Sequence, residues 1–107
     1  MDVVTIDGVV RVPTQLITDT IITAVEQGIY YWCSRSAVGS LNWLRASFVE
    51  RDTGTTFALT AEDWPRVVAL MAAKAPRHYP TMIDEQGDAE TADVLVQLAC
   101  FGEIKYG

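Results

Sequence analysis

The chain is poor in basic residues. Its 8 Lys and Arg stand against 14 Asp and Glu, which gives a formal net charge of −6 at pH 7. A protein that binds nucleic-acid phosphates without sequence preference needs clustered Lys and Arg, and here the basic residues are spread along the sequence. We therefore expect no direct nucleic-acid binding.

Long apolar runs and export signals are also missing. No stretch approaches the roughly 18 apolar residues that a membrane-spanning helix needs. The first ten residues, MDVVTIDGVV, carry acidic side chains where a secretory signal carries basic ones. These absences favour a soluble, intracellular protein without membrane contact.

The common catalytic and metal-binding patterns are absent as well. The sequence has no GxSxG, no phosphate-binding loop, no GxGxxG and no HExxH. Its two cysteines, Cys33 and Cys100, form neither a CxxC pair nor a Cys/His pair of the kind that binds zinc. Without an export signal, reduced thiols are favoured over a disulfide. The sequence thus predicts no catalytic residue, no metal ligand and no cofactor, and an enzyme is the less favoured class.

Two groups of polar residues invite a functional interpretation and a plain one. The single histidine, His78, lies between Pro76 and Pro80; a solvent-facing loop histidine is favoured over a catalytic one, which would need a positioned nucleophile or carboxylate. The acidic group that follows lacks the order of glycine and glutamate in an EF-hand loop, so helix capping and solvation are favoured over metal binding. The members of this group are Asp84, Glu85, Asp88, Glu90 and Asp93.

The sequence does contain enough apolar residues for one folded domain. Hydrophobic residues make up 50% of the 107, which suffices for a single core that buries roughly 65% of the unfolded surface. One domain over residues 1–107 is therefore expected.

Periodicity and turn residues place the elements of this domain. In the first half they predict a hairpin over 1–12 with Asp7-Gly8 at its turn, a helix over 14–27 ended by Gly28, a strand over 29–35 and a connection over 38–44. In the second half they predict a hairpin over 46–59, a helix over 61–75 capped by Thr60, and a mobile irregular segment over 76–87. A helix over 89–101 capped by Asp88 and a terminal strand over 103–106 complete the prediction. The order ββαβββααβ predicts an α+β domain with three helices packed against one antiparallel sheet.

An aromatic segment with nearby arginines is the candidate binding surface. In a strand over 29–35, Tyr30 and Trp32 would share one face and Tyr31 the other. A face that combines aromatic rings with guanidinium groups suits a stacked base with its phosphate, or a protein interface. The alternative is that both faces are buried, one under helices and one in a subunit contact. The predicted ligand- or partner-binding residues are Tyr30, Trp32, Arg35, Trp43 and Arg45.

The same aromatic content predicts self-association. The chain has more large aromatic side chains than one thin α+β layer easily hides, among them Trp64 and Phe101. Exposed apolar patches of this kind mark interaction sites, and closed dimers are the commonest oligomers. We expect a homodimer or a larger homo-oligomer.

Three segments, TDTIITAVEQGIYYWC (18–33), TTFALTAEDWPRVVALM (55–71) and TADVLVQLACFGEIKYG (91–107), resemble a group of small proteins from tailed-bacteriophage genomes. That group typically has a Gly-Gly turn after its first helix, where this chain has Gln27-Gly28. The resemblance brings no catalytic residue. It implies a phage or prophage accessory protein acting in the cytoplasm of the bacterial host.

By analogy with such genes, the expected function is non-enzymatic binding that occludes a host protein or sequesters a small nucleotide signal used in defence. A structural or assembly protein of the phage particle is an alternative. A small nucleotide-processing enzyme is a less favoured one, because the sequence offers no nucleophile–base pair.

Overall fold

The structure is a computed structural model of the chain and describes residues 3–6, 10–39, 44–83 and 88–107. Within these ranges the elements are β1 (Val3–Ile6), β2 (Val10–Pro13), α1 (Thr14–Thr23), the π-helical segment η1 (Ala24–Gly28), β3 (Cys33–Val38), β4 (Ala46–Glu50), β5 (Thr56–Leu59), α2 (Trp64–Lys74), α3 (His78–Ile83) and α4 (Ala89–Phe101). The predicted α+β class is confirmed.

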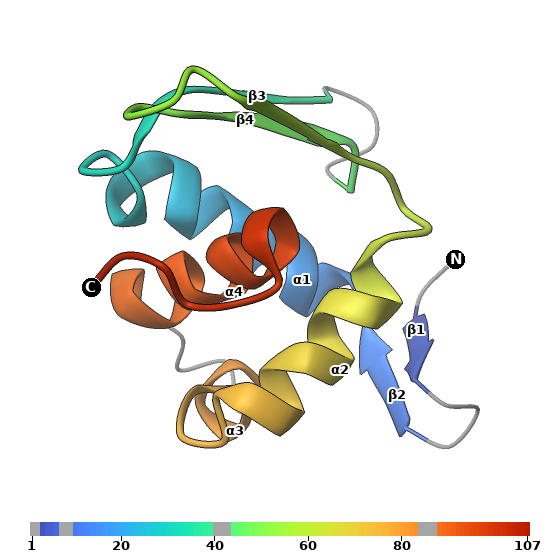
Figure 1. The fold of residues 1–107 in the computed structure, drawn as a ribbon. Helices are drawn as coiled ribbons and strands as arrows, with labels where there is room; N and C mark the ends of the chain where they lie inside the picture. Colours follow the sequence, from blue (N-terminus) through green and yellow to red (C-terminus); the bar gives the residue numbers. More distant parts are fainter. Residues whose placement is uncertain (1–2, 7–9, 40–43, 84–87) are drawn as a thin grey trace.

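The strands form two sheets where the sequence predicted one. β1 and β2 pair as an antiparallel hairpin, and β3, β4 and β5 form a separate antiparallel sheet in that order. The predicted pairing within 46–59 is confirmed, while the turn residues Asp7-Gly8 lie outside the described residues. β2 ends at Pro13, which lacks an N–H for a sheet ladder, and α1 begins at the next residue. The hairpin is therefore cut off from the later strands and packs beside α2 (Figure 1).

The three-stranded sheet covers one side of the helices (Figure 1). Alternate residues turn to opposite faces, so the face toward the helices carries buried side chains, namely Cys33, Ala46, Phe48, Glu50 and Leu59. The other face is more open and carries Arg35, Ala37, Ser47, Val49 and Ala58. An irregularity in register lies between Cys33 and Arg35. This sheet therefore has one core face and one face toward solvent.

The segment expected to begin the aromatic strand is a turn over residues 29–32, and the strand starts only at Cys33. The N–H groups of Trp32 and Cys33 both donate to the carbonyl oxygen of Ile29, at 3.2 and 2.8 Å. Tyr31 and Trp32 also both donate to the carboxylate of Asp93. Neighbouring residues in a strand point to opposite faces, so a strand could not bring both side chains to one carboxylate.

The terminal strand predicted over 103–106 is wrong, because residues 103–107 join no sheet. α4 ends at Gly102, which has φ of 72° and so takes a backbone conformation that favours glycine. The N–H groups of Lys105 and Tyr106 then donate to the side-chain oxygen of Gln97, each at 2.8 Å. A side chain of α4 replaces the sheet partner that the sequence suggested.

The first helix extends over 14–28 as α1 and η1, close to its predicted range. Gly28, which was expected to end this helix, is its last residue, although the described glycines with positive φ are Gly54 and Gly102. A Cβ atom on Gly28 would lie 2.7 Å from the carbonyl oxygen of Ala89. Glycine is required here because η1 approaches the start of α4 too closely for a side chain.

Two further sequence expectations about helices change. Thr60 was expected to cap α2 with its hydroxyl, but α2 begins at Trp64, and the Asp63 carboxylate instead accepts the Thr60 N–H at 2.7 Å. Within 76–87, residues 78–83 form α3, so that part is not irregular. The predicted cap of α4 is confirmed, since Asp88 accepts the Thr91 N–H at 2.9 Å.

α4 lies at the centre of the fold and contacts α1, η1, α2 and α3 (Figure 1). Its residues 91–99 are all buried, including the polar side chains of Thr91, Asp93 and Gln97. Among the described residues, no helix has the length and apolar character to cross a membrane. The polar side chains of this central helix position the candidate site.

Candidate functional site: a groove along helix α4

The five residues predicted to form a binding surface are not brought together in one. Tyr30 is 62% exposed, whereas Trp32 is 1% exposed and belongs to the core. Trp43 lies outside the described residues. The sequence left open the alternative that this segment is buried, and for Trp32 that alternative holds. Its ring therefore does not contribute to an exposed binding surface.

Arg35 and Arg45 are both exposed and lie far apart along the β3–β4 pair. Arg35 is opposite Val49, whereas the carbonyl oxygen of Arg45 accepts the Gly39 N–H beyond the other end of the ladder. The outward-facing residues between them are the small Ala37 and Ser47. No described aromatic side chain sits between the two arginines, so the combination of stacking ring and guanidinium is not formed there. Whether Tyr30, Arg35 and Arg45 bind a ligand stays a prediction.

A groove along α4 gathers more chemistry than this sheet face. It has a volume of about 620 Å³, within the range of roughly 300–1,000 Å³ typical of ligand sites. Its walls come from η1, the turn over 29–32, α3, α4 and the tail over 103–107. We call it the α4 groove, and it is lined by Gly28, Tyr31, His78, Ala89, Glu90, Asp93, Val94, Gln97, Ile104, Tyr106 and Gly107.

A hydrogen-bonded cluster forms the polar wall of the α4 groove. The Tyr31 hydroxyl donates to Asp93 Oδ2, and Trp32 Nε1 donates to Asp93 Oδ1 at 2.7 Å. Gln97 Nε2 donates to Asp93 Oδ1 at 3.0 Å and lies 3.3 Å from the Tyr31 hydroxyl oxygen. The carboxylate thus accepts three hydrogen bonds, which is how a buried charge is satisfied.

The same contacts keep the phenol of Tyr31 protonated. Burial of its hydroxyl against α4, followed by the hydrogen bond to the Asp93 carboxylate and the charge of that group, raises the pKa of Tyr31 to about 12. Tyr31 therefore acts as a hydrogen-bond donor at neutral pH and supplies no base.

His78 is a half-buried residue of α3 and not the solvent-facing loop residue expected from the sequence. Its Nδ1 lies 3.0 Å from the hydroxyl oxygen of Thr91, and its Nε2 lies 3.9 Å from a carboxylate oxygen of Glu90. Because Thr91 is 1% exposed, its hydroxyl is closed to a substrate. The pair joins α3 to α4 and is not an activated nucleophile.

The acidic group identified in the sequence divides into different roles. Asp88 caps α4, and the hydrogen bond from the Thr91 N–H holds the pKa of its carboxyl below the ordinary value. Asp93 faces the cluster just described, so the expectation that it is merely solvated is wrong. Asp84 and Glu85 lie outside the described residues. Among the described residues, no set of three His, Cys, Asp or Glu side chains could hold a metal ion.

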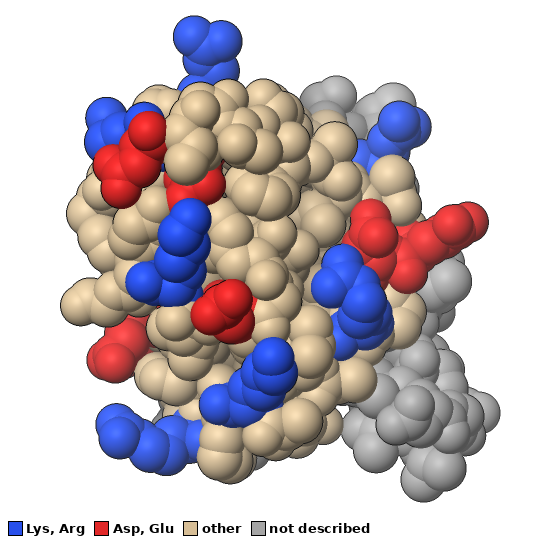
Figure 2. All heavy atoms as spheres, viewed as in Figure 1, with Lys and Arg blue, Asp and Glu red and all other residues tan. Residues whose placement is uncertain are grey.

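The described lining of the α4 groove is acidic, with Glu90 and Asp93 and neither Lys nor Arg. The Glu90 side chain is 73% exposed, whereas the apolar lining residue Ile104 is 46% exposed. Elsewhere, Lys and Arg are interspersed with Asp and Glu over the face in Figure 2, without a broad patch of either sign. The groove therefore offers an acidic rim, apolar surface and the ring of Tyr31, whose hydroxyl is held by Asp93.

This arrangement suits binding better than covalent chemistry. Nucleophilic catalysis needs a nucleophile beside a base. The two hydroxyl groups of the lining belong to Tyr31 and Tyr106, and each donates its hydrogen to a carboxylate, of Asp93 and Glu50 respectively. The two thiols lie outside the lining. Burial, then the charges of Cys33 and Glu50, raises the pKa of the Cys100 thiol to about 12, so it stays protonated and unreactive at neutral pH.

Sequence reasoning missed Tyr31, Asp93 and Gln97 as a group. Asp93 and Gln97 are separated by four residues and so lie on one face of a helix, a spacing visible in the sequence. Both interrupt an otherwise apolar run, which is a signal for a buried polar pair. Nothing local connects them with Tyr31, which lies more than sixty residues earlier.

Comparisons with models of protein families, with curated proteins and with solved structures found no match to this chain. The resemblance to tailed-bacteriophage proteins stays a prediction.

Proposed function

We propose that the protein is a non-catalytic binding protein that holds a segment of a partner protein in the α4 groove. The observation that carries this proposal is the combination of a 620 Å³ groove with polar groups that are already paired with one another. Such groups fix the shape of a site and orient a ligand. They supply neither a free base nor a free nucleophile.

The chemistry of the lining favours a basic segment as the occupant. Glu90 and Asp93 line the groove, and the described lining has no Lys or Arg to pair with a phosphate. A Lys or Arg of the partner would meet Glu90 at the rim, while an apolar neighbour would contact Ile104 and Val94. Complementary charge at an interface chiefly raises the association rate and the specificity. A small nucleotide is the less favoured ligand, because its phosphates would face these carboxylates.

The resemblance to tailed-bacteriophage proteins adds the proposal that the partner is a host protein of the bacterial cytoplasm, which binding would occlude. Self-association belongs to the same proposal: Tyr30 is an exposed large hydrophobic residue outside the groove lining, and a second copy could cover it without filling the groove. Light scattering over micromolar to millimolar concentrations tests this point. A monomer throughout that range would contradict it.

A charge reversal at the rim tests the proposed partner. We would compare the wild-type chain with Glu90→Arg and with the control Glu26→Arg, whose exposed residue does not line the α4 groove. Pull-down from bacterial lysate should give the same captured protein with the wild type and Glu26→Arg, and at least about threefold less with Glu90→Arg, because the reversal replaces an exposed attraction of about 0.2–1 kcal/mol with a repulsion of similar size.

Calorimetry against cyclic and linear nucleotides separates the less favoured functions. We expect neither binding nor turnover. Nucleotide binding that is weakened by Arg35→Ala or Arg45→Ala would move the site to the outer face of the sheet. Turnover of any nucleotide would contradict a non-catalytic function.

A further inference from the structure

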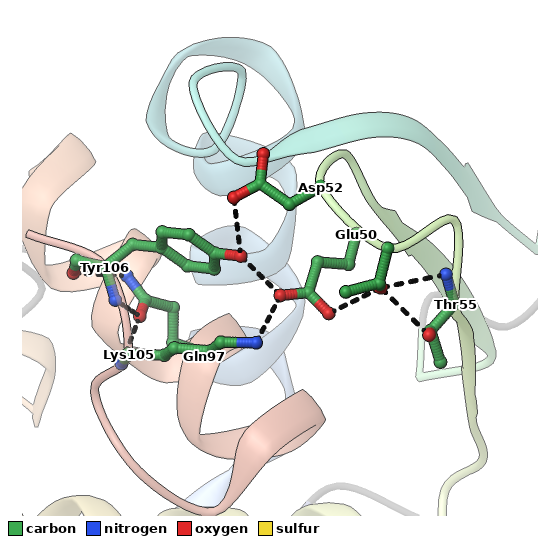
Figure 3. Close-up of polar contacts among 7 residues, drawn as sticks. Glu50, Asp52, Thr55, Gln97, Lys105 and Tyr106 are labelled. Atoms are coloured by element: carbon green, nitrogen blue, oxygen red, sulfur yellow. Dashed lines mark hydrogen bonds and ion pairs between the residues drawn. The ribbon is translucent and has the colours of Figure 1, made fainter.

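Lys105 and Tyr106, near the end of the tail, are held by buried polar side chains of β4 and α4. The carboxylate of Glu50 is 3% exposed and accepts a hydrogen bond from Lys105 Nζ at 2.5 Å, another from the Tyr106 hydroxyl, and a third from the Thr53 hydroxyl at 2.8 Å. The hydrogen bonds from Lys105, Tyr106 and Thr53 lower the pKa of Glu50 to about 2. The carboxylate is therefore ionised, with one oxygen bound by the tail residues Lys105 and Tyr106 and the other by Thr53 (Figure 3).

The side chain of Gln97 forms hydrogen bonds with the backbone of the same two tail residues. Its Oε1 accepts the N–H groups of Lys105 and Tyr106, and its Nε2 donates to the Tyr106 carbonyl oxygen at 3.0 Å. Gln97 is completely buried, and Figure 3 places its amide against the tail. Two successive N–H groups that converge on one oxygen form a turn-like nest, because neighbouring N–H groups of an extended strand point in opposite directions.

Aromatic rings complete the contact with Tyr106. Its ring stacks on Trp32 with centroids 6.0 Å apart and planes 3° apart, and it also contacts Phe101. Lys105 Nζ lies 5.1 Å from the centre of the Phe101 ring. We call Glu50, Gln97, Trp32 and Phe101 the tail seat.

We propose that the tail seat is a recognition site for a Lys-Tyr segment, which the chain's own tail fills in cis and which a partner segment of the same chemistry can fill in its place. The seat makes three kinds of contact with such a segment. The buried carboxylate of Glu50 accepts hydrogen bonds from the ammonium and the phenol, the amide of Gln97 pairs with the backbone, and Trp32 stacks on the tyrosine ring. Since the tail belongs to no sheet, its release breaks these contacts and no strand ladder. Gln97 and the tail also line the α4 groove, but the contacts at Glu50, Trp32 and Phe101 do not involve Glu90, so this proposal stands whether or not the groove binds a partner.

The test uses the full-length chain with Lys105→Ala and Tyr106→Ala, which removes the side-chain contacts with Glu50, Trp32 and Phe101 and leaves only backbone contacts with Gln97. The acetylated peptide Glu-Ile-Lys-Tyr-Gly is the probe. A tethered tail acts at an effective concentration on the order of millimolar. Calorimetry should therefore show the peptide binding at least about tenfold more tightly to this variant than to the wild type. Peptides with Lys105→Gln or Tyr106→Phe should each bind about tenfold more weakly, because each loses a hydrogen bond to a charged group.

Equal binding of the three peptides to the folded variant, or no binding, would overturn the proposal. A measurement on the wild type decides the matter if the variant does not fold. The amides of Lys105 and Tyr106 should exchange hydrogen by local opening, at least about tenfold faster than those at the centre of α4 and independently of low denaturant. Exchange of the two tail amides only through global unfolding would equally overturn it, because a tail that never opens cannot be replaced.

Discussion

Helices α2 and α4 have similar lengths and contact each other, yet they hold the fold in different ways. α2 buries one apolar stripe, Trp64, Val67, Val68 and Met71, and leaves Ala72, Ala73 and Lys74 exposed. α4 is buried over nine consecutive residues and carries three polar side chains into the interior. An apolar stripe can pack against any apolar surface of matching shape, because hydrophobic burial is not directional.

The polar residues of α4 are directional, and each fixes one segment. Thr91 contacts His78 of α3, Asp93 holds the turn over 29–32, and Gln97 holds the tail. α2 therefore stabilises the fold through non-directional hydrophobic burial, whereas the polar residues of α4 determine the positions of the walls of the α4 groove and of the tail seat. Substitutions that conserve shape can separate these two contributions.

The largest expected effect comes from Asp93→Asn. An asparagine amide would turn its NH₂ toward one of the donors from Tyr31, Trp32 or Gln97, so we expect a loss of about 2–3 kcal/mol in the free energy of unfolding. The equally shape-conserving Met71→Leu in α2 should cost below about 1.5 kcal/mol. Urea denaturation measures the free energy of unfolding of both variants, and equal losses would contradict the difference proposed between the two helices.

Gly28→Ala tests the close approach of η1 to α4. The added methyl group would meet the carbonyl oxygen of Ala89, and relieving that contact should cost about 2 kcal/mol. The control Gly102→Ala meets no atom within 4 Å and bears only the strain of positive φ, about 1 kcal/mol. Faster hydrogen exchange in the first turn of α4 should accompany Gly28→Ala alone. A control that costs more than Gly28→Ala would contradict this account.

Acid should release the tail before it affects α2. The pKa of Glu50 in the folded protein is about 2, below its ordinary value of 4.5. Its stabilising contribution is therefore complete above about pH 4.5 and is lost as the pH falls through about 2. NMR signals of the Tyr106 ring should report this transition, and Glu50→Gln should remove it. A midpoint near pH 4.5 would show that Glu50 is not held by the tail.

The smallest effect is expected from the ionisation of the Tyr31 hydroxyl at high pH. The folded-state pKa of about 12 exceeds the ordinary 10.0, so the contribution of this hydroxyl is complete below about pH 10 and is lost as the pH rises through about 12. The difference in tyrosinate absorbance between the wild type and Tyr31→Phe isolates this group. Asp93→Asn should lower the midpoint, whereas Met71→Leu should leave it unchanged. A midpoint at or below 10 would mean that α4 does not hold Tyr31.

Much of the fold followed from local pattern. The α+β class, the hairpin over 46–59, the apolar stripe of α2 and the Asp88 cap of α4 were all predictable, because periodicity, turn residues and capping act within a few residues of one another. The predictions failed for the strand at 29–32 and the terminal strand. In both places a polar side chain of α4 captures the segment from outside its own sequence neighbourhood.

The candidate site was less predictable than the fold. Tyr30, Arg35 and Arg45 are exposed as a binding surface requires, but strand alternation put Trp32 on their surface when it belongs to the core. The α4 groove combines residues from three stretches of the sequence, 28–31, residue 78 and 89–107. No spacing rule connects Tyr31 with Asp93, or Glu50 with Tyr106, because these pairs meet only after the chain has folded back on itself.

The sequence by itself determined which segments are apolar, where most helices begin and end, and that the chain is acidic and lacks the common catalytic patterns. The tertiary structure alone decided that Asp93 and Gln97 are buried, that Trp32 is in the core, and that the tail lies on Gln97 and Glu50. The physical reason is that local preferences depend on neighbouring residues, whereas a buried polar group needs partners, and those partners come from whichever distant segments the packing brings to it.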